Sequence, residues 1–357
     1  GEITASGGWL GSGIGGGIFG TGTVTIEGSA VIKDAQGGAG AAGIGGGSYG
    51  DGDVKISGNA VITNAESAGY GSGIGAGQGS LQNNISTVGD VTIEGNAKIE
   101  NAKGGYLASG IGGGSWGGTG TVVIRDNAQI DSSIGGTAGA GIGSGILGDV
   151  TVSIEGNSTI GTTMGGTDGA GIGGGYGSLG DVTIEGNVTI KNAQGGAGSA
   201  GIGSGSDAET KDDGTGNRIV IRSNKDGSPT INATGGVPKV DNNGNVISAG
   251  GAAIGSGASE ADADITIKGK VTIDAKAGEG NAAIGANNTE QTVNGLAGGT
   301  TIKRTDSNGK DVTQDGDVVA EPEKPAQPTV TPTEAAEAPS TGSVEVERPV
   351  TVEGLYV

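Results

Sequence analysis

The sequence contains no cysteine and no histidine, and only 2% of its residues are aromatic. Without cysteine the chain has no disulfide, no thiolate metal site and no thiol nucleophile. A single methionine and so few aromatic rings leave too little bulk for a broad globular core. We therefore expect the 357-residue chain to be built on a thin core of Ile, Val and Ala.

Basic residues are scarce as well, with 19 Lys and Arg against 39 Asp and Glu and a net charge of −20. Because no basic stripe is available to neutralise phosphates, we expect neither nucleic acid nor an anionic lipid surface as a partner. No apolar run approaches the roughly 18 residues of a membrane span, so we expect no membrane insertion. No signal-peptide leader is visible, which suggests that a leader has been removed or that the chain is a piece of a longer one.

The side chains that most often carry catalysis are poorly represented. Histidine and cysteine are missing, the lysines and arginines do not cluster, and the acidic residues recur with the repeat instead of gathering at one place. General acid–base catalysis needs a basic residue or a carboxylate pair held in a cleft. We therefore expect that the protein is not an enzyme.

Glycine, by contrast, is abundant, with 84 residues, and many of them belong to a recurring phrase related to Ala-Gly-Ile-Gly-Gly-Gly. The isoleucine of this phrase returns at spacings of 30, 30, 37, 31, 30, 30, 52 and 30 residues. A self-similar period of this length is typical of solenoids and other repeat arrays. The recurring isoleucines are Ile14, Ile44, Ile74, Ile111, Ile142, Ile172, Ile202, Ile254 and Ile284.

Each repeat contains three short apolar segments. The first alternates, as in Val91-Thr92-Ile93, which favours a strand with Val and Ile facing inward. A Gly-Asn or Gly-Ser corner leads to a second strand, centred for example on Ile99, and the Gly-Ile-Gly phrase is the third. The pattern contains no amphipathic helix. It predicts an all-β fold, a parallel β-helix (β-solenoid) of about ten coils with roughly 30 residues and three short strands per coil.

Composition divides the chain into three parts. Residues 1–319 are expected to form the Gly-rich β-solenoid, interrupted by polar loops at 206–217 and 236–248. Residues 320–342, rich in Pro, Glu, Ala and Thr, are expected to be a disordered linker. Residues 343–357 alternate again and are expected to be a tethered β-strand or the start of a further domain. Their apolar positions, which are candidates for self-assembly, are Val344, Val346, Val350, Val352 and Leu355.

Asparagine recurs at equivalent corners of successive repeats. Stacked in register, such amides hydrogen-bond along the array as a ladder. Because the positions follow the structural period, a ladder is favoured over ligand binding. One set of corner residues comprises Asn59, Asn96, Asn127, Asn157 and Asn187, and a second comprises Asn64, Asn101 and Asn192.

An acidic residue precedes the first strand in most repeats, as at Asp53 and Asp90, while Thr23 and Thr121 take the place in two others. Stacked carboxylates could bind calcium, and Asp51 beside Asp53 is the best candidate site. The alternative, which we favour, is that these carboxylates accept hydrogen bonds from turn amides. No other cofactor is expected.

The few aromatic residues are not scattered. Phe19, Tyr49, Trp116 and Tyr176 each follow a repeat isoleucine by four or five residues, and Leu147 has the same place in its repeat. They should form one column, either a platform on which sugar rings stack or a packing ladder that covers a corner. Trp9, Tyr70 and Tyr106 precede the Gly-Ile-Gly phrase and could flank the same face.

The units at 42–47, 140–143 and 170–175, each followed by a strand of the Asp-Val-Thr-Ile-Glu-Gly type, resemble the Gly-rich repeat regions of large cell-surface proteins of Gram-positive anaerobes. The resemblance covers about residues 3–302. It implies an extracellular or cell-surface location in a Gram-positive bacterium and, for function, adhesion or carbohydrate binding. The segment 338–342, Ala-Pro-Ser-Thr-Gly, is similar to a sortase sorting signal with Ala in place of Leu, although no apolar stretch follows it.

Two hypotheses about function follow. The first is a structural rod that assembles head to tail with further copies of itself, through open solenoid edges and addition of the C-terminal strand. The second is an adhesin that binds a cell-surface glycan through the aromatic column or through the loops at 206–217 and 236–248. We favour the first.

Overall fold

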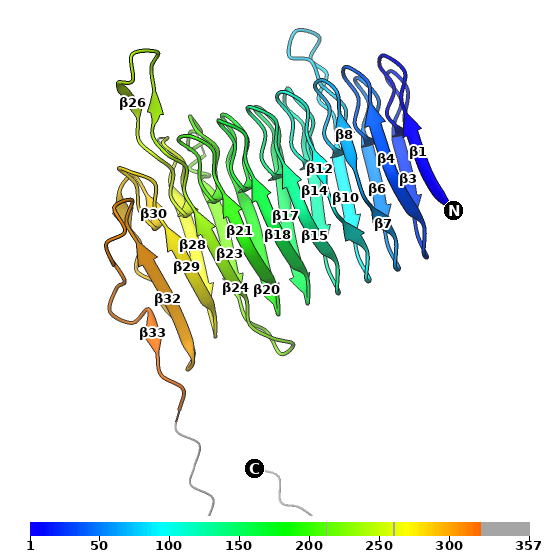
Figure 1. The fold of residues 1–357 in the computed structure, drawn as a ribbon. Coiled ribbons are helices and arrows are strands. Elements are labelled where there is room, and N and C mark those ends of the chain that lie inside the picture. Colours follow the sequence, from blue (N-terminus) through cyan, green and yellow to red (C-terminus); the bar gives the residue numbers. More distant parts are fainter. Residues whose placement is uncertain (212, 260, 323–357) are drawn as a thin grey trace, which may run out of the picture. The chain divides into compact units, whose positions relative to one another are not determined.

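The computed structural model describes residues 1–322 except 212 and 260. Gly1–Glu321 form one compact unit. Within the described residues the secondary structure is entirely β, and most strands run parallel to their neighbours in three stacked sheets (Figure 1). This confirms the predicted all-β solenoid. Most of the predicted linker and the whole of the predicted strand 343–357 lie outside the described residues.

The alternating first segments of the repeats form one sheet, here called sheet C. Val54, Val91 and Val122 lie in register, as do the isoleucines two positions later, and all are buried. The residues between them face solvent, as the alternation predicts. The eight strands of sheet C are β3 (Gly22–Ile26), β6 (Gly52–Ile56), β10 (Gly89–Ile93), β14 (Thr119–Ile124), β17 (Asp149–Gly156), β20 (Asp181–Gly186), β23 (Asn217–Arg222) and β28 (Ala263–Lys268).

The second segments form the 13-stranded sheet A. Its first strand, Glu2–Ser6, pairs in parallel with Val31–Gly37. The strands of sheet A are β1 (Glu2–Ser6), β4 (Val31–Gly37), β7 (Val61–Ile62), β8 (Ala65–Ser67), β11 (Lys98–Ile99), β12 (Ala102–Lys103), β15 (Gln129–Ile134), β18 (Thr159–Met164), β21 (Thr189–Gln194), β24 (Thr230–Thr234), β29 (Thr272–Lys276), β32 (Thr300–Thr305) and β33 (Val318–Val319).

The Gly-Ile-Gly phrases form sheet B, in which successive repeat isoleucines pair with one another from Ile14 to Ile284. The glycine after each isoleucine has a positive φ, as at Gly173 with +127°, and lies against the backbone of the next coil. The strands of sheet B are β2 (Ile14–Gly15), β5 (Ile44–Gly45), β9 (Ile74–Gly75), β13 (Ile111–Gly112), β16 (Ile142–Gly143), β19 (Ile172–Gly173), β22 (Ile202–Gly203), β27 (Ile254–Gly255), β30 (Ile284–Ala286) and β31 (Thr289–Glu290).

The core between the three sheets is a thin stack of Ile, Val and Ala, as the composition predicts. The predicted asparagine ladder is also present. Asn96 donates to Asn59 at 3.0 Å, and the chain of amide hydrogen bonds continues through Asn127 and Asn157 to Asn187. In the second set, Asn101 donates to Asn64 at 2.6 Å. These side chains therefore tie neighbouring coils together.

The loop at 236–248 contains a short antiparallel hairpin, β25 (Lys239–Val240) with β26 (Val246–Ser248), where the sequence predicts only a polar loop. The coils continue on both sides of it, through β24 and β27. The hairpin and the segment between β9 and β10 project beyond the ends of the strands on the same side in Figure 1.

At the C-terminal end of the described unit, sheets A and B are covered by short antiparallel strands, whereas β28, the last strand of sheet C, has no strand beyond it among the described residues. β31 pairs antiparallel with β30, the last Gly-Ile-Gly strand, and β33 pairs antiparallel with β32. Arg304 is fully buried there, with its guanidinium on Asp317 and Glu290. At the other end, the outer edges of β1, β2 and β3 have no strand partner among the described residues. The two ends therefore differ.

Candidate functional site

The aromatic residues of the described chain all lie on the surface. Trp9, Phe19, Tyr70 and Tyr106 are exposed and the remaining three are half-buried. They occupy the two turns that flank the Gly-Ile-Gly strands, so no ring contributes to the core between the sheets. Rings outside the core keep part of their surface open to solvent, where a ligand could reach it.

The turn that follows each Gly-Ile-Gly strand holds bulky residues in a conformation that suits glycine. Phe19, Tyr49, Trp116 and Leu147 have φ values of 57°, 63°, 65° and 51°. We call these four residues the apolar corner. The left-handed conformation costs a residue with a side chain about 1–2 kcal/mol. In the next coil Gly177 takes the same place with φ of 66°, so the turn itself does not require a side chain there.

The expected single column is incomplete. Phe19 and Tyr49 stack, with ring centroids 5.3 Å apart, and Tyr70 meets Tyr106 edge to face at 6.2 Å on the neighbouring turn. Tyr176 lies one position before the left-handed corner of its own turn. It is therefore offset from the other three aromatic candidates.

Tyr176 is also occupied by an intramolecular partner. The Lys239 ammonium, on the β25–β26 hairpin, lies 5.4 Å from the ring centroid and 2.7 Å from a carboxylate oxygen of Asp168. The negative charge of Asp207 beside the phenol raises the pKa of Tyr176, with partial burial adding to the effect. This ring helps to hold the hairpin against the coils.

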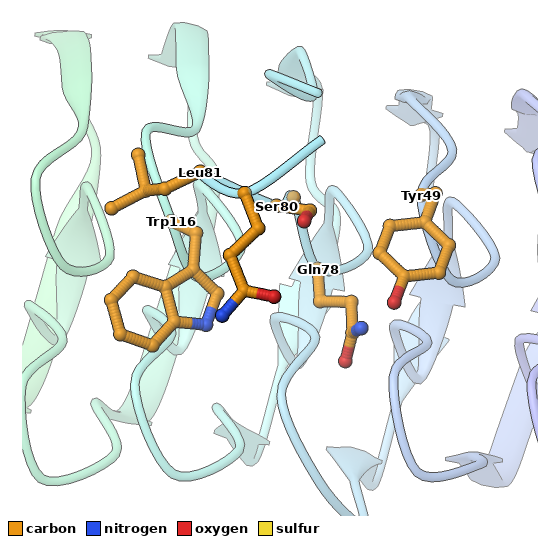
Figure 2. A pocket seen from close by; sticks show the side chains of 7 residues that line it. Tyr49, Gln78, Ser80, Leu81 and Trp116 are labelled. Carbon is orange, nitrogen blue, oxygen red and sulfur yellow. The ribbon is translucent and has the colours of Figure 1, made fainter. Parts of the chain in front are cut away.

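A cleft of about 330 Å³ opens between Tyr49 and Trp116. The two rings belong to coils that are separated by one intervening coil, and the intervening coil lacks an aromatic at this corner. In its place is the segment between β9 and β10, where Ser80 and Ile85 pair antiparallel around a tight turn. Figure 2 shows Gln78 and Ser80 between the two rings and Leu81 beside Trp116.

The lining of this cleft is polar but uncharged. Besides the two rings and Leu81 it comprises the carboxamides of Gln78 and Gln82, the Ser80 hydroxyl and Gly79. The cleft beside Leu147 and Tyr176 is different, since it contains Asp149, Asp207, Glu209 and Lys211. The Tyr49–Trp116 cleft is thus an uncharged site on a chain of net charge −20.

Sequence reasoning placed Tyr49 and Trp116 correctly at one corner but missed Gln78, Ser80 and Gln82. A signal was available, because the spacing from Ile74 to Ile111 is 37 residues instead of about 30. The extra residues form the segment that builds the middle of the cleft. The self-assembly candidates from Val344 to Leu355 lie outside the described residues.

Of the two calcium candidates, Asp51 and Asp53, the first makes a side-chain hydrogen bond within the fold. The Asp51 carboxylate accepts from the Val88 backbone N–H at 2.7 Å, and Asp90 likewise accepts from the Thr121 N–H at 2.8 Å. Asp53 pairs in register with Asp90 in sheet C. Within the described residues no group of three or more acidic side chains is placed to hold a metal ion. Both donors are backbone amides of the next coil, and that of Thr121 belongs to strand β14, so the turn-amide role stays a prediction.

We expect millimolar calcium to leave the thermal unfolding midpoint unchanged relative to EDTA. A ligand that binds only the folded state would raise the midpoint, because it adds its binding free energy to the stability. Differential scanning fluorimetry in both buffers checks this. A calcium-dependent rise that disappears in Asp51→Asn would instead establish the site.

Comparison of the chain with family models, with curated proteins and with solved structures gives no match. Within residues 1–322, gaps at 212 and 260 aside, no helix has the length and apolar character needed to cross a membrane.

Proposed function

We propose that this protein is a non-enzymatic, extracellular structural element, a rod of about ten coils displayed at a bacterial surface. Coils that repeat at the strand spacing of about 4.8 Å give such a rod a length on the order of 50 Å. The stacked isoleucine core and the asparagine ladder support this proposal, because both join each coil to the next and stiffen the stack.

The observation that carries the proposal further is the difference between the two ends. At the C-terminal end β31 and β33 cover the last strands of sheets B and A, and Arg304 is buried beside them, so direct stacking of a further coil on these two sheets is blocked. At the first coil, Ile3 is 49% exposed although its register partner Ile32 is buried. A strand added beside β1 would bury Ile3 and pair the free backbone groups.

We propose residues 343–357 of a second copy as that strand. Val344 and Val346 alternate in the way that β1 and its neighbours do, and the segment follows a Pro-rich stretch that can span a gap. Each copy would then offer one edge and one strand. Because such a contact does not close on itself, it builds a filament.

The full chain is expected to form filaments by negative-stain electron microscopy as its concentration rises. A chain ending at Glu321 should remain as single particles, because it lacks the added strand. Ile3→Lys should also prevent filaments, since it places a charge in the layer that the new strand must cover. Val246→Lys, on an exposed position of the hairpin, is the matched control and should still assemble. Identical filaments from the chain ending at Glu321 would refute the proposal, as would single particles of the full chain at every concentration.

A second candidate function is carbohydrate binding by a cell-surface adhesin. The observation that favours it is the apolar corner, whose side chains are exposed or half-exposed and whose backbone would suit glycine better. The two functions are compatible, because the corner and the first-coil edge are different surfaces.

A further inference from the structure

The strongest unexplained feature of the described residues is that Tyr49 and Trp116 keep aromatic side chains in a left-handed turn. Gly177 makes the same turn without a side chain. The turn therefore requires neither ring, and among the described residues the one intramolecular ring contact of the pair is the stacking of Tyr49 on Phe19. Strained residues that the surrounding fold does not need occur mainly at binding sites, where the side chain itself has a use.

The second feature is that the two rings border the place where the repeat is interrupted. The long spacing from Ile74 to Ile111 inserts the segment that carries Ser80, Leu81 and Gln82 into the gap between them. Irregular segments on a regular scaffold are where binding sites are usually built. Here the interruption and the aromatic pair form one cleft, seen in Figure 2.

The third feature is the chemistry of the lining. Two aromatic faces provide apolar contact, while two carboxamides, the Ser80 and Tyr49 hydroxyls and the Trp116 indole N–H provide hydrogen-bond donors and acceptors. None of these groups carries a charge at neutral pH. A cleft of this kind selects a ligand that has both apolar C–H faces and many uncharged hydroxyl groups.

The spacing of the rings adds a condition on ligand length. Tyr49 and Trp116 are two coils apart, which corresponds to about 9.6 Å along the stack at the usual strand spacing. This is more than one sugar ring spans. Two alternate rings of an extended pyranose chain would instead meet the two side chains, with the intervening ring over Gln78 and Ser80.

We propose that the Tyr49–Trp116 cleft binds a neutral, extended polysaccharide chain. One pyranose stacks on Trp116 and another on Tyr49, and the Gln78 and Gln82 carboxamides hydrogen-bond to ring hydroxyls between them. This inference rests on the second candidate function above and assigns it a site and a ligand class.

The test is native affinity electrophoresis of the full chain in gels containing hydroxyethyl cellulose, xylan, galactomannan or polygalacturonate, with a gel without polysaccharide as reference. We expect retardation in at least one of the three neutral polysaccharides. Trp116→Gly and Tyr49→Gly should each weaken that retardation at least tenfold. The thermal unfolding midpoint of Trp116→Gly should stay the same or rise because the turn strain is relieved, whereas Tyr49→Gly also loses its stacking on Phe19. Gln82→Ala should weaken it severalfold.

Leu147→Gly is the matched control, since Leu147 has the same backbone conformation but lines the charged cleft. It should leave retardation in the neutral gels unchanged. The proposal is overturned by retardation in none of the neutral gels, by retardation only in polygalacturonate, or by equal retardation of Trp116→Gly. The gels are run at a protein concentration at which size-exclusion chromatography gives a monomer, so a failure to bind sugar and a failure to form filaments are separate results.

Discussion

Replacing Arg304 with methionine is expected to unfold the C-terminal end of the solenoid and to lower the free energy of unfolding of that end by about 3–5 kcal/mol. Arg304 is fully buried, and its guanidinium makes two hydrogen bonds to Asp317, at 2.7 and 3.0 Å. Asp317 is itself buried. The methionine would fill the space but would leave that carboxylate in a low-dielectric site without a partner.

The effect should reach sheet B because Arg304 also holds Glu290, at 2.7 Å. The Glu290 carboxylate accepts hydrogen bonds from the backbone N–H groups of Ala283 and Ile284, which lie at the last edge of that sheet. Without Arg304 this carboxylate would be freed and the edge exposed to water. The backbone amides of β30 should then exchange with solvent faster than those of β22.

Native-state hydrogen exchange and urea unfolding measure this result. Arg304→Met combined with Asp317→Leu is the control, because it removes both buried charges of the pair and should recover part of the lost stability. If the backbone amides of Ala283 and Ile284 exchange no faster in Arg304→Met than in the parent chain, the strands that cover this end do not depend on the ion pair.

The C-terminal cap, made of β31, β33 and buried Arg304, could not be predicted from the sequence. In sheet A, Arg304 lies in register with Ala275, and Ala275 with Ala233, so an arginine stands at an inward position that earlier coils fill with a small residue. A repeat pattern predicts what recurs, and this residue occurs once. Its partner Asp317 follows a polar stretch with no period, so nothing in the sequence alone pairs the two.

The recurring parts were predictable for the opposite reason. Val91 and Ile93 face inward because the side chains of a strand alternate between its two faces, and the same alternation recurs in the other coils. Asn96 and Asn127 lie at equivalent corners, so the period alone brings their amides together. The Tyr49–Trp116 cleft contains both kinds of residue, some that recur with the period and some that do not. Its rings follow the period, whereas Ser80 and Gln82 line it because the inserted segment folds back, with Ser80 paired to Ile85.

Replacing Gly173 with alanine is also expected to give a large loss of stability, more than about 3 kcal/mol. Gly173 has φ of +127°, a conformation that costs residues with a side chain about 1–3 kcal/mol. A Cβ there would also lie only 2.1 Å from the Gly203 carbonyl oxygen of the next coil. Both partners in this clash are backbone, so neither can turn away.

The position of Gly173 in the middle of sheet B increases the consequence. A solenoid is stabilised by contacts between neighbouring coils, so a coil forced away from the next one weakens the coupling of the two halves.

Urea unfolding of Gly173→Ala should show a lower midpoint and a broader or two-step transition. Gly17→Ala is the matched control, because a Cβ at Gly17 meets no atom within 4 Å and its φ is not positive. If both variants unfold like the parent chain, close backbone packing of the Gly-Ile-Gly strands is not what holds the coils together. If only Gly173→Ala is destabilised, the close contact between coils requires the glycines of the Gly-Ile-Gly phrase. The aromatic side chains of the apolar corner are then the part of the repeat that the fold itself does not explain.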